Sequence, residues 1–283
     1  MLSALHPFAT TGQAPGQASG QAPDQASDAG RPDLPFPAVC AQVRADTHAF
    51  FLDVDGSLID IADHPDAVQV PEHLPQVLAA LAEQADGALA LVSGRTIQSL
   101  DMLLHPFGFA AAGSHGAQMR LAPDGKILSA PALDVALARE VTAVADGFDG
   151  VFAEDKGTAI AVHYRAAPDA ALTLRRALLD VLGARQDVRL MPGHCVFEVK
   201  PASLDKGTAV ADFMGRAPFA GRIPLFIGDD FTDEAGFCAV AARGGLALAV
   251  GAPRPGAHGV LADPRSVRAF LTHLAAVPRQ RRR

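Results

Sequence analysis

The stretch Ala49-Phe50-Phe51-Leu52-Asp53-Val54-Asp55-Gly56 decides the expected fold of this chain. It is a nearly unbroken apolar run that ends in two acidic residues and a glycine. Continuous apolar residues are typical of a strand that is buried on both faces, as the strands of parallel sheets are. The stretch therefore predicts a central parallel strand whose carboxyl end carries Asp53 and Asp55.

Strands and helices alternate after this stretch and again late in the chain. Pro71-Glu72 begins an amphipathic helix, and the apolar run 88–92 leads into another helix. The late elements are a helix from Asp205, a strand over 223–227, a helix from Thr232, a strand over 246–250 and a helix over 264–276. This alternation predicts an α/β fold with a Rossmann-like, doubly wound parallel sheet that binds ligands at the carboxyl ends of its strands.

The middle of the chain follows a different pattern. Residues 118–129 resemble a hairpin around Pro123-Asp124-Gly125-Lys126, and a helix–strand–strand–helix–strand–strand succession follows. Because core elements border this segment on both sides, we expect an inserted α+β cap of the αββαββ type over the functional edge of the sheet. The expected division is a leader over 1–42, a core over 43–117 and 201–278, a cap over 118–200 and a basic tail over 279–283.

Composition restricts the class of protein. The 283 residues carry 24 basic and 31 acidic side chains, and 49% of them are hydrophobic, as in a folded chain. Repeats of Gly-Gln-Ala-Pro/Ser between Gly12 and Pro23 offer no apolar face, so we expect the leader to be disordered. No apolar stretch is long enough to cross a bilayer, and a net charge of −7 disfavours nucleic acid as a partner. Three separated cysteines and the absence of a basic amino-terminal region indicate a cytoplasmic protein with reduced thiols and no membrane partner.

Five aspartates follow predicted strands at one edge of the sheet. Asp53 and Asp55 end the first strand, and Asp229, Asp230 and Asp233 follow a late strand. Like charges ~4 Å apart repel by about 4 kcal/mol at an effective dielectric constant near ~20, so such a cluster needs a cation. Oxygen ligands without nearby histidine or cysteine favour Mg²⁺ over zinc. For Asp230 and Asp233 a second interpretation stays open, because aspartate at a helix start also serves as an N-cap.

Hydroxyl and basic groups accompany the acidic cluster. Ser93-Gly94-Arg95 lies where a strand gives way to a helix, and helix amino termini bind anions. Lys206 lies just inside a helix start, where a cation is unfavourable unless an anion is near. Taken singly, these signals also fit an N-cap serine and a solvated lysine.

Together with the aspartates, these groups predict phosphoryl transfer. Asp53 can attack phosphorus as a nucleophile and form an aspartyl-phosphate. Asp55 can protonate the leaving oxygen and then deprotonate the water that hydrolyses the intermediate. Ser93, Lys206 and Mg²⁺ would stabilise the charge on the phosphoryl oxygens.

These segments resemble, in order, the four motifs of the haloacid-dehalogenase-like (HAD) phosphatases. The matching segments are Phe51-Leu52-Asp53-Val54-Asp55-Gly56-Ser57-Leu58, Ser93-Gly94-Arg95, Lys206 and Gly228-Asp229-Asp230-Phe231-Thr232-Asp233-Glu234. Within that superfamily the chain resembles the trehalose-6-phosphate phosphatases, from about Phe50 to the last helix. The segments that carry this likeness are the last motif, Gly113-Ser114-His115-Gly116, Val162-His163-Tyr164-Arg165, Glu198-Val199-Lys200-Pro201 and Asp205-Lys206-Gly207.

The resemblance implies a HAD core with an α/β cap and Mg²⁺-dependent hydrolysis of trehalose 6-phosphate, a step of trehalose biosynthesis. It implies that Asp53, Asp55 and Asp229 bind the metal, Asp55 through its carbonyl oxygen. It also points to the His115-Gly116 loop, Glu198 and Lys200 as sugar contacts. With the anion site, the candidate substrate-binding residues are Gly94, Arg95, His115, Gly116, Glu198 and Lys200. Ser57 stands where the first motif usually has threonine, and the hydroxyl is kept.

Strand alternation adds an argument about the substrate. In the predicted strand 194–200, Glu198 and Lys200 share a polar face, and a hydroxyl-rich substrate needs matched donors and acceptors. A solvated outer face is the alternative for these two residues. We interpret the charged segment 154–156 as the turn of a hairpin with a structural role.

Three other functions stay open on the sequence. Another capped phosphatase, acting on sucrose phosphate or a mannosyl phosphate, would use the same motifs. A phosphoacceptor signalling domain also uses a strand-end aspartate, Mg²⁺ and a lysine, but it is roughly half as long and lacks a lid and the second acid, Asp55. A pure sugar-binding module leaves the acidic cluster unexplained. We therefore expect a phosphatase whose partner is a small sugar phosphate.

Overall fold

The computed structural model of the chain describes residues 38–61, 68–193 and 195–277. The expected tail over 279–283 and residues 1–37 of the expected leader lie outside the described residues. Residues 38–42 of that leader form a 3₁₀-helix, η1 (Ala38–Gln42), and Cys40 is buried against the apolar core. The packed part of the described chain thus begins before residue 43.

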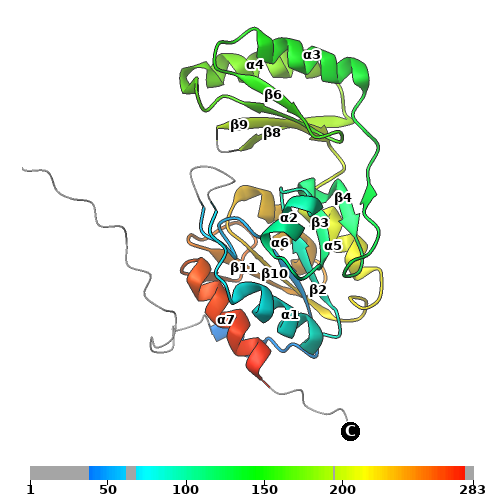
Figure 1. Ribbon diagram of the computed structural model, residues 1–283, viewed down its shortest axis with the longest axis vertical. Helices are drawn as coiled ribbons and strands as arrows, with labels where there is room; N and C mark the ends of the chain where they lie inside the picture. The colour runs from blue at the N-terminus through cyan, green and yellow to red at the C-terminus, as the bar shows by residue number, and fades with distance from the viewer. Residues whose placement is uncertain (1–37, 62–67, 194, 278–283) are drawn as a thin grey trace, which may run out of the picture. The chain divides into compact units, whose positions relative to one another are not determined.

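The central sheet is mostly parallel, which confirms the expected α/β fold class (Figure 1). In spatial order its strands are β12 (Gly259–Leu261), β11 (Leu246–Val250), β10 (Ile223–Gly228), β1 (His48–Leu52), β2 (Leu89–Val92), β3 (Ala110–Gly113), β4 (Gln118–Arg120) and β5 (Leu128–Ser129). Every residue of β1 is buried, and the strand pairs in parallel with β10 on one side and β2 on the other. The apolar stretch that opened the sequence analysis is therefore the middle of the sheet.

Helices cover the core sheet in pairs. They are α1 (Leu74–Gln84), α2 (Ile97–Leu103), α5 (Lys206–Met214), α6 (Glu234–Ala241) and α7 (Pro264–Ala276). α1 packs against α7, and α5 packs against α6. Asp205 is the N-cap of α5 and forms a capping box with Thr208, which makes Lys206 the first residue of the helix. Within the part of the chain that the structure describes, none of the helices has the length and apolarity needed to cross a membrane.

Three phenylalanines fix α5 against β1. The ring centroid of Phe51 in β1 lies 5.9 Å from that of Phe213 in α5 and 5.5 Å from that of Phe219. The rings of Phe213 and Phe219 are 4.9 Å apart, and all three side chains are buried. Because Lys206 begins α5 and Asp53 follows β1, this packing sets the position of the lysine relative to the aspartate.

A second, antiparallel sheet forms the inserted cap. Its elements are α3 (Val135–Asp146), β6 (Phe152–Asp155), β7 (Ile160–His163), a short 3₁₀-helix η4 (Pro168–Ala170), α4 (Ala171–Leu182), β8 (Val188–Gly193) and β9 (Val196–Pro201). This succession confirms the expected order of helices and strands, and the strands lie in the order β6-β7-β9-β8. In Figure 1, α3 and α4 cover one face of this sheet. The register places Glu198 opposite Ala161 and Met191, on the face away from the apolar cluster that those helices cover.

Residues 118–129 differ from the expected division into domains. They form the expected hairpin, with β4 antiparallel to β5, but β4 also pairs with β3 of the core sheet. The structure therefore joins this hairpin to the core, although the sequence analysis placed it in the cap. The hydrophobic pattern of a hairpin shows that two strands pair with each other; it does not show which sheet they extend.

Candidate active site

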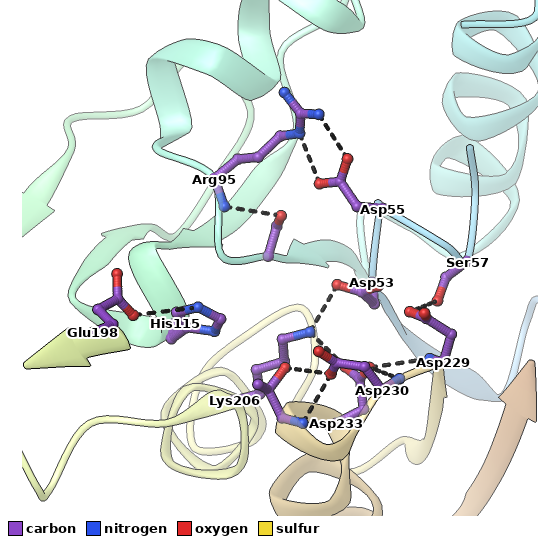
Figure 2. A network of polar contacts seen from close by, with 12 residues as sticks. Asp53, Asp55, Ser57, Arg95, His115, Glu198, Lys206, Asp229, Asp230 and Asp233 are labelled. Atoms are coloured by element: carbon purple, nitrogen blue, oxygen red, sulfur yellow. Dashed lines mark hydrogen bonds and ion pairs between the residues drawn. The ribbon is translucent and has the colours of Figure 1, made fainter. Parts of the chain in front are cut away.

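Asp53 lies where β1 ends at the edge of the sheet. Its N–H donates to the carbonyl oxygen of Ile227 at 2.9 Å, so the residue extends the ladder between β1 and β10. The side chain is 4% exposed, and Oδ1 accepts a hydrogen bond from Lys206 Nζ at 2.7 Å (Figure 2). Burial raises the pKa of Asp53, and the Lys206 ammonium opposes that rise.

Lys206 joins two carboxylates. Its Nζ donates to Asp53 at 2.7 Å and to Asp233 at 2.6 Å, and the residue is 2% exposed. Burial alone would lower the pKa of Lys206, but the carboxylates of Asp233 and Asp53 hold it above its ordinary value. The solvated lysine that the sequence left open is therefore excluded, and the ammonium is a fixed positive charge beside Asp53.

Three carboxylates meet beside this lysine. Oxygens of Asp53, Asp229 and Asp233 lie within 4.8 Å of one another. Asp233 uses one oxygen for Lys206 and the other to accept the N–H groups of Asp229 and Asp230, at 3.0 and 3.1 Å. Burial and the charge of Asp53 raise the pKa of the Asp229 carboxyl to about 7. Such crowding of negative charge calls for a proton or a cation between Asp53 and Asp229, and an all-oxygen donor set suits Mg²⁺.

Asp230 has the capping role that the sequence left open. It is the N-cap of the short 3₁₀-helix η5 (Phe231–Asp233), and its Oδ1 accepts from the N–H of Thr232 at 2.8 Å and from the hydroxyl of that residue at 2.6 Å. Asp233 completes the capping box and also holds Lys206. Both residues thus shape the turn that carries Asp229.

The side chain of Asp55 does not join the carboxylate cluster. It accepts two hydrogen bonds from the guanidinium of Arg95, at 2.7 and 2.6 Å (Figure 2). The chain turns directly after Asp55, where Gly56 has a φ of +81°. A Cβ at Gly56 would also overlap the Asp229 carboxylate, so only glycine allows the two loops to approach this closely.

Ser93 and the His115 loop form the opposite wall of the site. Ser93 is buried, and its Oγ accepts the N–H of Arg95 at 3.1 Å. The N–H of His115 donates to the carbonyl oxygen of Ser93 at 3.0 Å, in a left-handed turn with φ of +53° at His115. A Cβ at Gly94 would lie 2.7 Å from the His115 ring, so a larger residue there would displace the imidazole. Burial and the charge of Lys200 hold the pKa of His115 well below its ordinary value, which keeps the imidazole neutral.

The cap brings a polar face to this wall. Glu198 of β9 lies 3.5 Å from His115 Nε2 and accepts from Lys156 Nζ at 3.3 Å. Glu198 is 7% exposed and Lys200 only 2%, which excludes the solvated outer face that the sequence left open. Among the described residues, Lys200 Nζ and His115 Nδ1 are buried without a hydrogen-bond partner. Burial also lowers the pKa of Lys200 to about 8. Buried polar atoms without partners are unfavourable, so these two atoms are available to hydrogen-bond a polar ligand.

Of the predicted site residues, the structure thus brings Asp53, Lys206 and Asp229 into one cluster. Ser93, Gly94 and Arg95 form the wall beside it. Arg95 holds Asp55, and the His115 loop meets Glu198 of the cap. Gly116 ends that loop with a φ of +95°, in close approach to Asp205.

Two neighbours of the site are not among the predicted site residues, although Ser57 belongs to the first motif. The Oγ of Ser57 donates to Asp229 Oδ1 at 3.3 Å, and Ser57 is fully buried. Lys156, which we interpreted as part of a structural turn, reaches Glu198. Its N–H bonds to Ala159, which continues the β6–β7 ladder, so the alternation of the hairpin could have placed Lys156 on the face of Glu198.

A parallel sheet that joins Asp53, Lys206 and Asp229 at its edge, with an α/β cap inserted beside it, defines a phosphatase of the HAD class. The model of the trehalose-phosphatase family matches residues 51–262. The chain therefore belongs to the trehalose-phosphatase family, and its members are phosphoric monoester hydrolases.

Curated relatives support this membership. A probable trehalose-phosphate phosphatase of Sinorhizobium fredii is 43% identical over 235 residues, which cover 81% of this chain and 88% of the relative. The trehalose-6-phosphate phosphatase of Escherichia coli is 40% identical over 242 residues, which cover 83% of this chain and 89% of the relative.

Solved structures support the fold. The C-terminal domain of the Candida albicans trehalose-6-phosphate phosphatase superposes with a TM-score of 0.70 over 81% of this chain and 93% of that one, at 24% identity. A trehalose-6-phosphate phosphatase of Aspergillus fumigatus has a TM-score of 0.60 at 27% identity, over 81% of this chain and 93% of that one.

Proposed function

We propose that this protein hydrolyses trehalose 6-phosphate to trehalose and phosphate through an aspartyl-phosphate, with the help of Mg²⁺. The observation that carries the proposal is the cluster of buried Asp53 and Lys206 with half-buried Asp229, together with two buried polar atoms that have no hydrogen-bond partner, Lys200 Nζ of the cap and His115 Nδ1 of the core. The substrate is that of the relatives with trehalose-phosphate phosphatase in their names.

In the first chemical step, an oxygen of Asp53 attacks phosphorus and the bond from phosphorus to the sugar oxygen breaks. Lys206 favours the ionised form of the nucleophile and would hold it in place, since its ammonium donates directly to Asp53. Ser93 and the N–H groups that follow it would donate to the phosphoryl oxygens.

Asp55 is the proposed acid and base. As acid it gives its proton to the leaving sugar oxygen, and as base it takes a proton from the water that attacks the aspartyl-phosphate. That attack releases phosphate and restores Asp53. The two hydrogen bonds from Arg95 occupy both carboxylate oxygens of Asp55, so this ion pair must open when the sugar phosphate binds.

The proposed Mg²⁺ ligands are carboxylate oxygens of Asp53 and Asp229 and the main-chain carbonyl of Asp55. The residues fit such an ion, because the facing carboxylates of Asp53 and Asp229 carry more negative charge than Lys206 alone can offset. When bound, the ion would polarise a phosphoryl oxygen and orient the phosphate toward Asp53.

The cap is the proposed sugar-binding face. Glu198 would accept from sugar hydroxyls, Lys200 Nζ would donate to them, and His115 and Gly116 would meet the sugar from the core. A site built to hydrogen-bond hydroxyls discriminates strongly against ligands that lack them.

The nucleophile is tested by the variant Asp53→Asn, which removes the attacking oxygen while the lysine keeps Asp233 as a partner. We expect phosphate release from trehalose 6-phosphate to fall by at least about 10³-fold with the fold unchanged by circular dichroism. The exposed Asp149→Asn is the matched control, and turnover of D53N close to that of D149N would refute the assignment.

Substrate and metal are tested together on the purified protein. Phosphate release is measured for trehalose 6-phosphate, sucrose phosphate and a mannosyl phosphate, each with Mg²⁺ and with excess chelator. We expect trehalose 6-phosphate to be the best substrate and the chelator to abolish its turnover until Mg²⁺ is restored. A stable phosphorylated protein without repeated turnover would instead favour a phosphoacceptor domain.

A further inference from the structure

Asp229 is held on both sides of its main chain. Its N–H donates to Asp233 Oδ2 at 3.0 Å, within the turn after β10. Its carbonyl oxygen accepts a hydrogen bond from Arg254 Nε at 2.9 Å, from a loop 25 positions further along the chain. Ser57 adds a weaker contact to the carboxylate, at 3.3 Å. Three segments therefore hold Asp229: the turn that contains Asp233, the loop that contains Arg254 and the segment that contains Ser57.

Arg254 lies in a loop beside the strand that leads to Asp229. It belongs to the connection between β11 and β12, and β11 pairs directly with β10, the strand that leads to Asp229. Arg254 is half-buried, and its planar guanidinium presents the Nε–H in a fixed direction. The turn after β10 is also held by hydrogen bonds within residues 229–233 and by the longer-range contacts of Asp229 with Ser57 and of Asp233 with Lys206.

We propose that Arg254 is a positioning residue, which orients Asp229 for the divalent cation by holding its carbonyl oxygen. This inference rests on the proposed function, because it takes the cation to bind at Asp53 and Asp229. Groups that orient metal ligands typically contribute about 10- to 100-fold to metal affinity or activity.

A purely electrostatic role and a positioning role of Arg254 predict opposite changes in cation affinity when Arg254 is replaced. A guanidinium near a cation site repels the cation, so a purely electrostatic role means that removal of Arg254 tightens cation binding. A positioning role means that removal loosens Asp229 and weakens cation binding. The direction of the change therefore separates the two roles.

The experiment measures the affinity of the full-length protein for Mg²⁺ by calorimetry and for Mn²⁺ by electron paramagnetic resonance, without substrate. We expect Arg254→Met to weaken both affinities by about tenfold and the Mg²⁺ concentration for half-maximal phosphate release to rise in parallel. Arg254→Lys keeps the charge and loses the planar Nε–H, so a weakened affinity in R254K cannot arise from charge; this variant also serves if R254M fails to fold.

The matched control is Arg243→Met. Arg243 is exposed and also donates to a main-chain carbonyl, that of Ala239 in α6, at 2.9 Å. We expect R243M to bind both ions as the wild type does. Unchanged or tighter binding in folded R254M or R254K would overturn the positioning role of Arg254. Failure of the wild type to bind either ion, or to release phosphate, would instead overturn the proposed function.

Discussion

The two buried lysines of this site, Lys206 and Lys200, differ in how their charge is compensated. Lys206 is buried and still charged because two carboxylates surround it, whereas Lys200 is buried with no partner among the described residues. Burial accordingly lowers the pKa of Lys200 to about 8, while that of Lys206 is raised. We therefore expect the buried charge of Lys200 to destabilise the fold, as residues kept for binding often do.

The variant Lys200→Met tests this conclusion through the pH dependence of stability. The folded chain binds the Lys200 proton less well than the unfolded chain, where the pKa is 10.5, so the destabilisation is complete below pH 8 and disappears as the pH rises to 10.5. We expect K200M to raise the free energy of unfolding at pH 7 by about 1–3 kcal/mol and to lose this gain toward pH 10.5.

Denaturant titrations at several pH values measure this effect. The control is Lys126→Met, because Lys126 is exposed and should show no such pH dependence. A stability of K200M that is equal to the wild type at pH 7, or that differs from it equally at every pH, would contradict the destabilising role of the Lys200 charge.

At the scale of elements, the site depends on how α5 packs against β1. Phe51, Phe213 and Phe219 form that contact; Phe51 lies two residues before Asp53, and Phe213 lies in the helix that Lys206 begins. A helix start and a strand end that must meet within hydrogen-bond distance require a rigid support. Dense aromatic packing supplies it, because cores transmit small displacements with little compression.

The variant Phe213→Ala removes the ring that α5 contributes. We expect the free energy of unfolding to fall by about 3–5 kcal/mol, through lost burial and the cavity left behind. Chemical denaturation measures the loss. Leu172→Ala is the control, since Leu172 is 73% exposed and should change stability by less than about 0.5 kcal/mol. Equal effects in the two variants would show that the aromatic contact does not support α5.

At the scale of the whole described chain, the proposed reacting groups lie in the core, whereas the proposed sugar contacts come from both the cap and the core. Asp53, Ser93 and Lys206 belong to the core, while Glu198 and Lys200 belong to the cap sheet. Glu198 reaches the core at His115, 3.5 Å away. Chemistry and selectivity should therefore respond separately to substitution.

The variant Glu198→Gln tests this division of roles. We expect kcat/KM for trehalose 6-phosphate to fall by about 10- to 100-fold, because hydrogen bonds to a charged group contribute about 1.5–3 kcal/mol. Turnover of p-nitrophenyl phosphate, which has a phosphoryl group and no sugar, should hardly change. The exposed Glu140→Gln serves as control, and an equal loss of E198Q on both substrates would argue that Glu198 acts in the chemistry instead.

Local sequence patterns predicted much of the fold. The strand over 246–250 and the helix over 264–276 match the structure, and the alternating cap elements have the expected order. β3 (Ala110–Gly113) and β12 were missed, because Ala-Ala-Ala-Gly lacks the β-branched and aromatic residues typical of strands and β12 is only three residues long. The hairpin of β4 and β5 was recognised, but its partner sheet was not.

The sequence by itself determined which side chains lie at the ends of the strands and helices. It could do so because the hydrophobic period and the helix caps depend on only a few neighbouring residues. Only the tertiary structure decided how those groups pair. Asp53 and Lys206 are 153 positions apart, and their ion pair depends on strand register and helix packing. The ion pair of Asp55 and Arg95 depends on the same long-range geometry. So does the burial of Lys200, whose Nζ has no hydrogen-bond partner among the described residues. Local patterns do not carry this information, since such contacts form only after distant segments pack together.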